Sequence, residues 1–199
     1  MSPRLRVVLA TRNPGKVREV AAILDDPYLE LAGPEVLSGV EFPDEGDTYE
    51  ENARVKARTA ARATGCIALA DDSGLEVDAL RGGPGPRSAR YGGSGLDDAG
   101  RCDHLLRALD GVPDSGRAAR FVCVAAVVTP DGREDIRRGI CAGRILREPR
   151  GASGFGYDPI FAVEANSRSM AELSAEEKNQ ISHRARAFRA LLPVLRQLG

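Results

Sequence analysis

The sequence has few of the residues that mark several common classes of protein. It contains no tryptophan, two histidines and four cysteines among 199 residues, and no two cysteines are spaced as C-x-x-C. Zinc sites are built mainly from cysteine and histidine, so a zinc site is not expected. Cys66 and Cys123 fall in strand-like apolar runs, where a reduced, buried thiol is the usual state. Any metal should therefore be a hard cation held by carboxylates, which points to Mg²⁺ or Mn²⁺.

Long apolar runs and an excess of one charge are also absent. The apolar run after Arg4 and Arg6 covers only residues 7–10, which is too short for a signal-peptide core or a membrane span, and no later segment qualifies. The formal net charge is −1, and the sequence has no basic stripe. These absences predict a cytoplasmic protein that binds neither nucleic acid nor membrane. A polyanionic substrate would have to be held by a local group of cations.

What is present fits one α/β domain with a mixed sheet, over residues 1–199. The length and the 42% hydrophobic share are enough for a substantial core. Apolar periodicity predicts strands at residues 7–10, 29–32, 66–70, 75–80, 118–129 and 135–146. Helices are predicted from Asn13, from Thr48, over residues 99–109 and from the capping box at residues 174–177. The last two strands, joined by a turn at residues 130–132, should form an antiparallel pair.

A candidate phosphate site lies between the first strand and the first helix, over Thr11, Arg12, Asn13, Pro14, Gly15 and Lys16. Unpaired N–H groups at a helix N-terminus favour an anion, and a lysine there adds a point charge. A simple capped helix with an exposed lysine explains the same residues equally well. The segment is not a Walker A loop, because G-x-x-x-x-G-K-[ST] is absent.

Carboxylates that could bind a divalent cation occur in two segments. Asp71 and Asp72 follow an apolar strand, and successive strand residues point to opposite sides, so only one of them faces a given site. Such a carboxylate could hold Mg²⁺ or orient a water for in-line attack on phosphorus, whereas the alternative is a plain D-S-G turn. Asp44 and Glu45, in the acidic loop over residues 41–47, could complete the metal shell or simply solvate a helix start.

Aromatic and basic residues near the C-terminus could bind a purine. Phe155, Tyr157 and Asp158 offer two ring faces and a carboxylate, although an aromatic plug on the core is an equally common use of such residues. The start of the last helix adds three polar side chains, Lys178, His183 and Arg184. His183 and Arg184 could donate hydrogen bonds to base oxygens, but a histidine beside an arginine is often only structural.

Together these segments resemble the noncanonical purine NTP pyrophosphatase family, also called inosine triphosphatases or Ham1-like proteins. Six stretches match in the family's order over nearly the whole chain: ATRNPGK at 10–16, EGDTYEENARVKA at 45–57, ADDSGLEVDAL at 70–80, GPGPRSARYGG at 83–93, GFGYDPIF at 154–161 and EEKNQISHRARA at 176–187. The resemblance implies a homodimer with an elongated α/β fold. It also implies a mixed β-sheet flanked by helices and two lobes with a central substrate cleft.

The resemblance further implies Mg²⁺-dependent hydrolysis of ITP, dITP and XTP to the monophosphate and pyrophosphate, which removes them from the nucleotide pool. Asp72 is then the catalytic carboxylate and a Mg²⁺ ligand, and a Mg²⁺-associated water attacks the α-phosphorus. The second metal carboxylate is Asp44 or Glu45, with Asp44 favoured by its spacing from Gly46. Residues 11–16 and Lys178 hold the triphosphate, with Ser73 beside the substrate. The residues implied for the base pocket are Phe155, Gly156, Tyr157, Asp158, His183 and Arg184.

Base selectivity has a simple chemical basis in this interpretation. Hypoxanthine and xanthine carry a carbonyl at C6 where adenine carries an amino group, so a donor such as Arg184 favours the former two. Arg12 replaces a small residue that the family often has, and it could tighten phosphate binding or point to solvent. Two alternatives stay open: a Maf-like pyrophosphatase for other modified nucleotides, and a non-catalytic nucleotide- or nucleic-acid-binding module, which the near-neutral charge disfavours.

Overall fold

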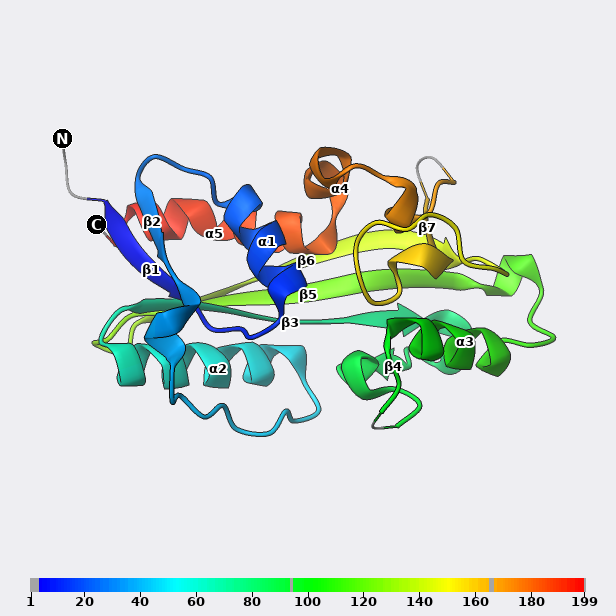
Figure 1. Ribbon diagram of the computed structural model, residues 1–199, viewed down its shortest axis with the longest axis horizontal. Helices are drawn as coiled ribbons and strands as arrows, with labels where there is room; N and C mark the ends of the chain where they lie inside the picture. The colour runs from blue at the N-terminus through cyan, green and yellow to red at the C-terminus, as the bar shows by residue number, and fades with distance from the viewer. Residues whose placement is uncertain (1–3, 94, 165–166, 199) are drawn as a thin grey trace. The chain divides into compact units, whose positions relative to one another are not determined.

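The computed structural model describes residues 4–93, 95–164 and 167–198. Figure 1 shows the order of the elements along the chain. The strands are β1 (Leu5–Leu9), β2 (Leu29–Ala32), β3 (Ile67–Val77), β4 (Pro84–Gly85), β5 (Ala118–Val128), β6 (Glu134–Ile145) and β7 (Phe161–Val163). The helices are α1 (Pro14–Ile23), α2 (Tyr49–Thr64), α3 (Asp98–Ala108), α4 (Ala175–Ile181) and α5 (His183–Arg196). Within the described ranges, no helix is both long enough and apolar enough to cross a bilayer.

The strands form one mixed sheet in the order β2-β1-β3-β5-β6-β7, with β4 paired to β3. β1 runs parallel to both β2 and β3, and α1 and α2 provide the crossovers that parallel strands need. β4 is antiparallel to β3, and β7 is antiparallel to β6. The predicted α/β fold with a mixed sheet is therefore confirmed.

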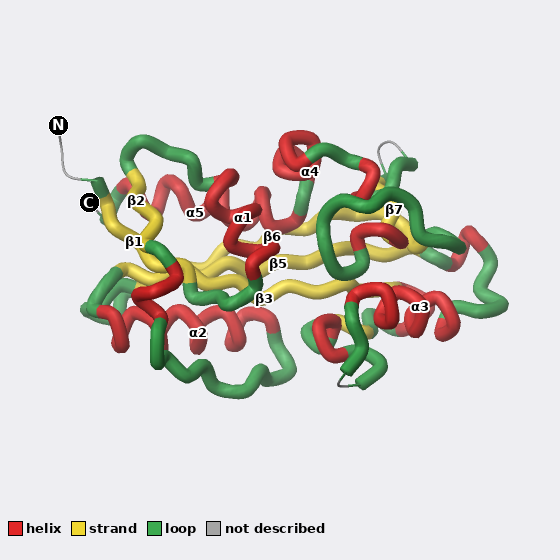
Figure 2. Tube along the Cα trace, in the orientation of Figure 1, coloured by secondary structure: helices red, strands yellow, loops and turns green. Residues whose placement is uncertain are grey.

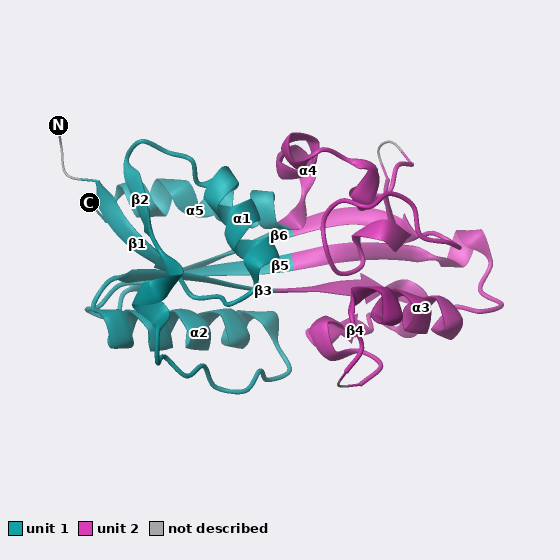
Figure 3. Ribbon diagram, viewed as in Figure 1, with its two compact units in different colours: residues 1–72, 123–139, 184–199 teal, residues 73–122, 140–183 magenta. Residues whose placement is uncertain are grey.

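The chain divides into two compact units, which Figure 3 shows in different colours. Unit 1 consists of residues 1–72, 123–139 and 184–199, and unit 2 consists of residues 73–122 and 140–183. β3, β5 and β6 each contribute residues to both units. The single domain predicted for residues 1–199 stays a prediction.

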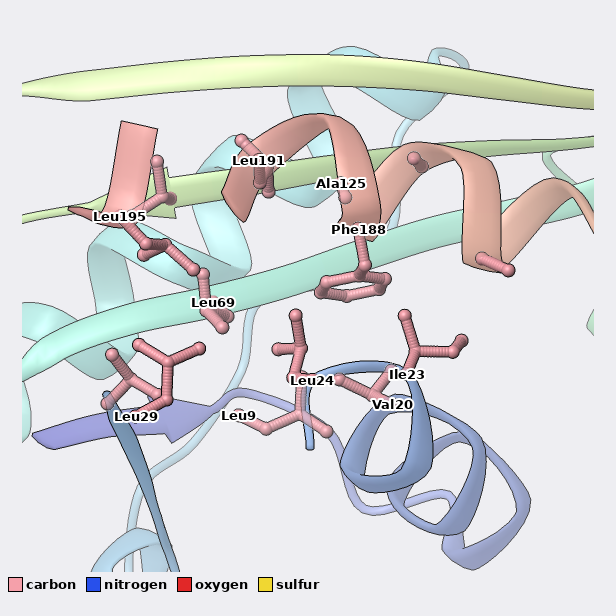
Figure 4. Close-up of a cluster of buried hydrophobic side chains, with 14 of the residues drawn as sticks. Leu9, Val20, Ile23, Leu24, Leu29, Leu69, Ala125, Phe188, Leu191 and Leu195 are labelled. Carbon is pink, nitrogen blue, oxygen red and sulfur yellow. The ribbon is translucent and has the colours of Figure 1, made fainter. Parts of the chain in front are cut away.

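The core of unit 1 lies between its strands and two helices (Figure 4). Val20 of α1, Phe188 of α5 and Leu69 of β3 are fully buried in this one cluster. The α5 stripe continues at Leu191 and Leu195, at the spacing of one helix face. Truncation of a buried phenylalanine to alanine costs about 3–5 kcal/mol, so this layer stabilises the strands that carry the site. Figure 2 shows α2 on the other side of these strands.

The core of unit 2 is a second apolar cluster, built around α3. Leu105 and Leu109 pack with Leu75 of β3, and all three are fully buried. The rings of Phe121 and Phe161 add an aromatic pair with centroids 4.5 Å apart. Each unit therefore has a core of its own.

Two predicted elements were wrong in their boundaries. The strands expected at 66–70 and 75–80 are one strand, β3, which continues through Asp71, Asp72 and Ser73 without a turn. Charged partners for both carboxylates, described below, make this burial possible where local turn propensity would end the strand. The single C-terminal helix is two helices, because Ser182 is extended (φ −65°, ψ 153°) and separates α4 from α5. The capping box that starts α4 at Ser174 is confirmed.

Candidate active site

The turn before α1 has the geometry of a well-capped helix start. Asn13 is the N-cap, and its Oδ1 accepts hydrogen bonds from the backbone N–H groups of Gly15 (2.8 Å) and Lys16 (3.2 Å). Pro14 has no N–H group to offer. The Asn13 cap therefore engages the donors of the first turn, and an anion here would depend chiefly on side chains.

Lys16 is nevertheless not the exposed lysine of a plain capped helix. Its side chain is only 15% exposed, and Nζ lies 3.0 Å from Oδ2 of Asp71. Nζ also lies 3.4 Å from the backbone carbonyl oxygen of Asp71. An ammonium has three N–H donors, and no acceptor other than Asp71 contacts it in the described part of the chain. Lys16 is thus a fixed cation with a donor to spare.

Asp71 is the centre of a buried charge cluster in unit 1. The Nε and Nη2 atoms of Arg184 each lie 3.3 Å from Asp71 Oδ2, and Arg184 Nη1 also donates to Glu19 Oε2 at 2.5 Å. Burial alone would raise the pKa of Asp71, but Lys16 and Arg184 hold it well below its ordinary value. Asp71 is therefore ionised, and it fixes both cations.

Asp72 has a different set of partners, as the alternation along a strand predicts. The Nδ2 atom of Asn52 donates to Asp72 Oδ2 at 2.9 Å, and Lys56 Nζ lies 3.2 Å from Oδ1. Asp72 is 3% exposed, and burial raises its pKa despite the opposing effects of Lys56 and Asn52. A carboxylate with raised proton affinity is suited to accept a proton. The prediction that the two carboxylates face different surroundings is confirmed.

The acidic loop is attached to the same two residues that hold Asp72. Lys56 pairs with Glu45, and Asn52 Oδ1 accepts a hydrogen bond from the Gly46 N–H at 2.7 Å. Glu45 and Asp72 therefore lie around one ammonium group, whereas Asp44 is exposed. Within the described residues, no three acidic, histidine or cysteine side chains converge as a ready-made metal cage. Mg²⁺ ordinarily needs only one or two carboxylates plus substrate phosphates, so these donors fit such an ion.

In unit 2, the predicted aromatic loop is built around a buried ion pair. Lys178 Nζ pairs with Asp158 Oδ2, and the two residues are 6% and 3% exposed. The same Asp158 oxygen accepts the Phe155 N–H at 2.9 Å, and Lys178 Nζ lies 5.1 Å from the centre of the Phe155 ring. Gly154 has φ +78°, and a Cβ there would lie 2.0 Å from Asp158 Oδ2. Only glycine fits at that position.

Residues that the sequence did not single out hold this loop in place. Asp98 Oδ2, on α3, accepts the Gly156 N–H at 2.7 Å, and the Tyr157 hydroxyl donates to the Ser88 carbonyl at 2.8 Å. The ring of His183, 5% exposed, stacks on Phe121 at 4.8 Å between centroids. Asp98 follows another aspartate at a helix start, a pattern that indicates capping rather than contact with a distant loop.

The predicted site residues thus divide between the two units, with two clusters in unit 1 and one in unit 2. Unit 1 brings together Lys16, Asp71 and Arg184, and separately Asp72 and Glu45, which are joined by Asn52 and Lys56, two residues outside the predicted set. Unit 2 brings together Phe155, Asp158 and Lys178, with Gly156 and Tyr157 in the same loop. Ser73, also in unit 2, is half-buried on β3.

Comparison with known proteins gives this arrangement a context. The sequence pattern of the Ham1 family matches residues 7–194. The chain belongs to the Ham1 family. It is 48% identical to the "dITP/XTP pyrophosphatase" of Streptomyces avermitilis over 196 residues, which cover 97% of this chain and 98% of that protein.

Solved Ham1 structures agree with this assignment. A HAM1 protein from Coxiella burnetii has a TM-score of 0.87 and 44% identity, with 97% of this chain and 99% of that chain covered. A dITP/XTP pyrophosphatase from Mycobacterium abscessus has a TM-score of 0.74 and 44% identity, with 95% and 100% covered. The family resemblance and the fold predicted from the sequence are both confirmed.

Proposed function

We propose that this Ham1-family chain hydrolyses dITP, ITP and XTP to the nucleoside monophosphate and pyrophosphate. Its Streptomyces and Mycobacterium relatives carry the name dITP/XTP pyrophosphatase. The observation that carries the proposal is the environment of Asp72, a buried strand carboxylate held by Asn52 and Lys56. The acidic loop is attached to the same two side chains.

The proposed reaction is an in-line displacement at the α-phosphorus. Asp72 accepts a proton from a water molecule whose oxygen bonds to the α-phosphorus. The P–O bond between the α-phosphorus and the bridging oxygen then breaks, and the electron pair leaves with pyrophosphate. Lys16, fixed by Asp71, places its remaining N–H donor on a phosphate oxygen, supported by Thr11 and Asn13. Lys178 is proposed as a second cation that binds phosphate. Ser73 is proposed to lie beside the substrate.

Asp72 and one acidic-loop carboxylate are the residues proposed to hold Mg²⁺. When bound, the ion would neutralise phosphate charge and lower the pKa of a water molecule. Glu45 is engaged by Lys56, whereas Asp44 makes no side-chain hydrogen bond or ion pair within the described residues. This difference supports Asp44 as the second ligand.

The residues proposed to bind the base are Phe155, Gly156, Tyr157, Asp158, His183 and Arg184. The buried Lys178–Asp158 pair fixes the loop, and the half-buried Phe155 ring is the proposed stacking surface. His183 and Arg184 are the proposed donors to the C6 carbonyl of the base. A homodimer and a cytoplasmic location complete the proposal, and light scattering in solution would measure the former.

Pyrophosphate release tests the proposal directly. Wild-type protein should release pyrophosphate from dITP, ITP and XTP with Mg²⁺ but not with EDTA, and far more slowly from ATP and GTP. Asp72→Asn should lower turnover by about 10²–10⁴-fold, the usual contribution of a general base. The exposed turn variant Asp131→Asn is the matched control. Near-normal turnover in Asp72→Asn would remove Asp72 from the mechanism.

The alternatives predict different results in the same assay. A Maf-like enzyme would release pyrophosphate from modified nucleotides outside the ITP and XTP set and would leave ITP intact. A non-catalytic module would bind nucleotide without any Mg²⁺-dependent release. Asp44→Asn and Glu45→Gln should be compared at limiting Mg²⁺. The variant that needs a higher Mg²⁺ concentration for pyrophosphate release identifies the second metal ligand.

A further inference from the structure

Arg12 links the phosphate turn, residues 11–16, to the acidic loop, residues 41–47. Its Nη2 atom donates to the backbone carbonyl of Val40 at 2.5 Å, across 28 residues of sequence. Its Cζ atom lies 5.8 Å from the centre of the Phe42 ring. All three residues belong to unit 1, so the contact lies within one compact body. The Arg12 side chain is directed to the start of the acidic loop.

The two contacts suit arginine in particular. A planar guanidinium can face an aromatic ring and donate hydrogen bonds, whereas the ammonium of lysine is a point charge on a flexible stem. Val40 is buried, and its N–H donates to the Leu37 carbonyl at 3.1 Å, so its backbone is held in place and its carbonyl is a fixed acceptor. Arg12 makes no ion pair with any carboxylate in the described ranges, so the contact does not neutralise the acidic loop.

The acidic loop is anchored at its other end by different residues. Asn52 bonds to both the N–H and the carbonyl of Gly46, at 2.7 and 3.3 Å, and Lys56 pairs with Glu45. The segment between these anchors has no regular secondary structure and contains the exposed Asp44. An unrestrained backbone gains conformational entropy, so the position of Asp44 depends on both ends of the loop being held.

We propose that Arg12 is a positioning residue that clamps the start of the acidic loop, so that Asp44 is presented in one place for a divalent cation. The proposal rests on the proposed function only in its choice of ligand, because the clamp itself is a property of the free protein. Arg12 therefore acts through the loop, in place of the direct triphosphate contact that the family resemblance implied for it. Substitution of Arg12 should weaken cation binding and leave nucleotide binding at saturating cation unchanged.

Arg18 provides a matched control. It is an exposed arginine on α1 that lines the same open pocket of about 830 Å³ as Arg12. Within the described residues it makes no hydrogen bond, ion pair or ring contact. Arg18→Met thus removes a positive charge near the same helix end and leaves the loop contact in place. Arg12→Met removes a positive charge and also the contact that holds the loop.

The first measurement needs neither metal nor nucleotide. A glutamate-specific protease should cut at Glu41 or Glu45 about tenfold faster in Arg12→Met than in wild type, because a charged hydrogen bond to the loop is lost. Arg18→Met should be cut at the wild-type rate, and Arg12→Lys at an intermediate rate. Phe42→Leu should raise the rate by a smaller factor. Equal loop cleavage in Arg12→Met and Arg18→Met, at matched melting temperatures, would overturn the clamp.

The second measurement separates the clamp from direct phosphate binding. Mn²⁺ binding without nucleotide, followed by electron paramagnetic resonance, should be about five- to tenfold weaker in Arg12→Met. At saturating Mg²⁺ the KM for ITP should match wild type. A raised KM with unchanged loop cleavage and unchanged Mn²⁺ affinity would make Arg12 a phosphate ligand instead. Wild-type protein that releases no pyrophosphate would refute the proposed function, while loop cleavage would still test the clamp.

Discussion

Asp71→Asn should lower the free energy of unfolding by about 3 kcal/mol, because it removes the buried carboxylate that Lys16 and Arg184 share. The side chain of Asp71 is fully buried, and its Oδ2 atom contacts both Lys16 and Arg184. Asparagine has nearly the same shape, so the variant tests charge rather than packing. The cost arises because the cations lose a partner for which they were desolvated.

The size of the loss depends on the carboxylate partner or the contact with water that each cation keeps in the variant. Loss of one partner of a buried ion pair typically costs about 3–5 kcal/mol. Arg184 retains Glu19, and Lys16, with its side chain 15% exposed, can turn partly to water, so the lower end of that range applies. For a chain of this length, each kcal/mol lowers Tm by roughly 2–4 °C, which gives a loss of about 6–12 °C.

The assay is urea unfolding at pH 7 in EDTA, followed by circular dichroism, with Glu30→Gln as the control. Glu30 pairs with Arg6 at 3.8 Å, but both side chains are more than half exposed, so its loss should cost less than about 0.5 kcal/mol. A double-mutant cycle with Lys16→Met isolates the pairwise energy. A loss below about 1 kcal/mol in Asp71→Asn would refute the argument that this carboxylate holds the cluster together.

Three further outcomes are expected. Arg81→Gly should stabilise the fold by about 0.5 kcal/mol in thermal unfolding, because Arg81 has φ +53° and relief of that strain exceeds the entropic cost of glycine; a lower Tm would contradict this. Only Cys66 should react rapidly with a thiol reagent at pH 8. Burial raises the pKa of Cys102 to about 12 and also raises the pKa of Cys123, and Cys141 is buried. Two fast thiols in native protein would be inconsistent with these environments. Tyr157→Phe should cost about 1 kcal/mol and raise the KM for ITP, because the Ser88 carbonyl loses its donor; an unchanged KM would separate this hydrogen bond from substrate binding.

Much of the fold follows from local signals in the sequence. Asn13 and Thr48 cap α1 and α2 as predicted, and Gly65 ends α2 in the left-handed region. Such signals are local, since a cap or a periodic stripe depends on residues within one or two turns. The break at Ser182 was missed because the apolar stripe continues across it from Ile181 to Ala185.

The site was less predictable because its partners are distant in sequence. The residues that bear charge were identified, but not which of them meet. Asn52 looked like an ordinary position on an alanine-rich helix, yet it bonds to both Asp72 and Gly46. Asp98 likewise accepts a hydrogen bond from the N–H of Gly156, which lies 58 residues away in the sequence. No periodicity encodes such pairs, so only the folded chain can show them.

The course of β3 explains why adjacent carboxylates can have opposite properties. A turn after residue 70 would place Asp71 and Asp72 on one edge, where each charge would raise the pKa of the other. A continuous strand sends them to opposite sides, and each meets its own lysine. Two cations then hold the pKa of Asp71 low, while burial raises that of Asp72 above its ordinary value. One carboxylate can thus stay ionised as a fixed anchor for Lys16, and its neighbour can take up a proton, which suits the base role proposed for Asp72.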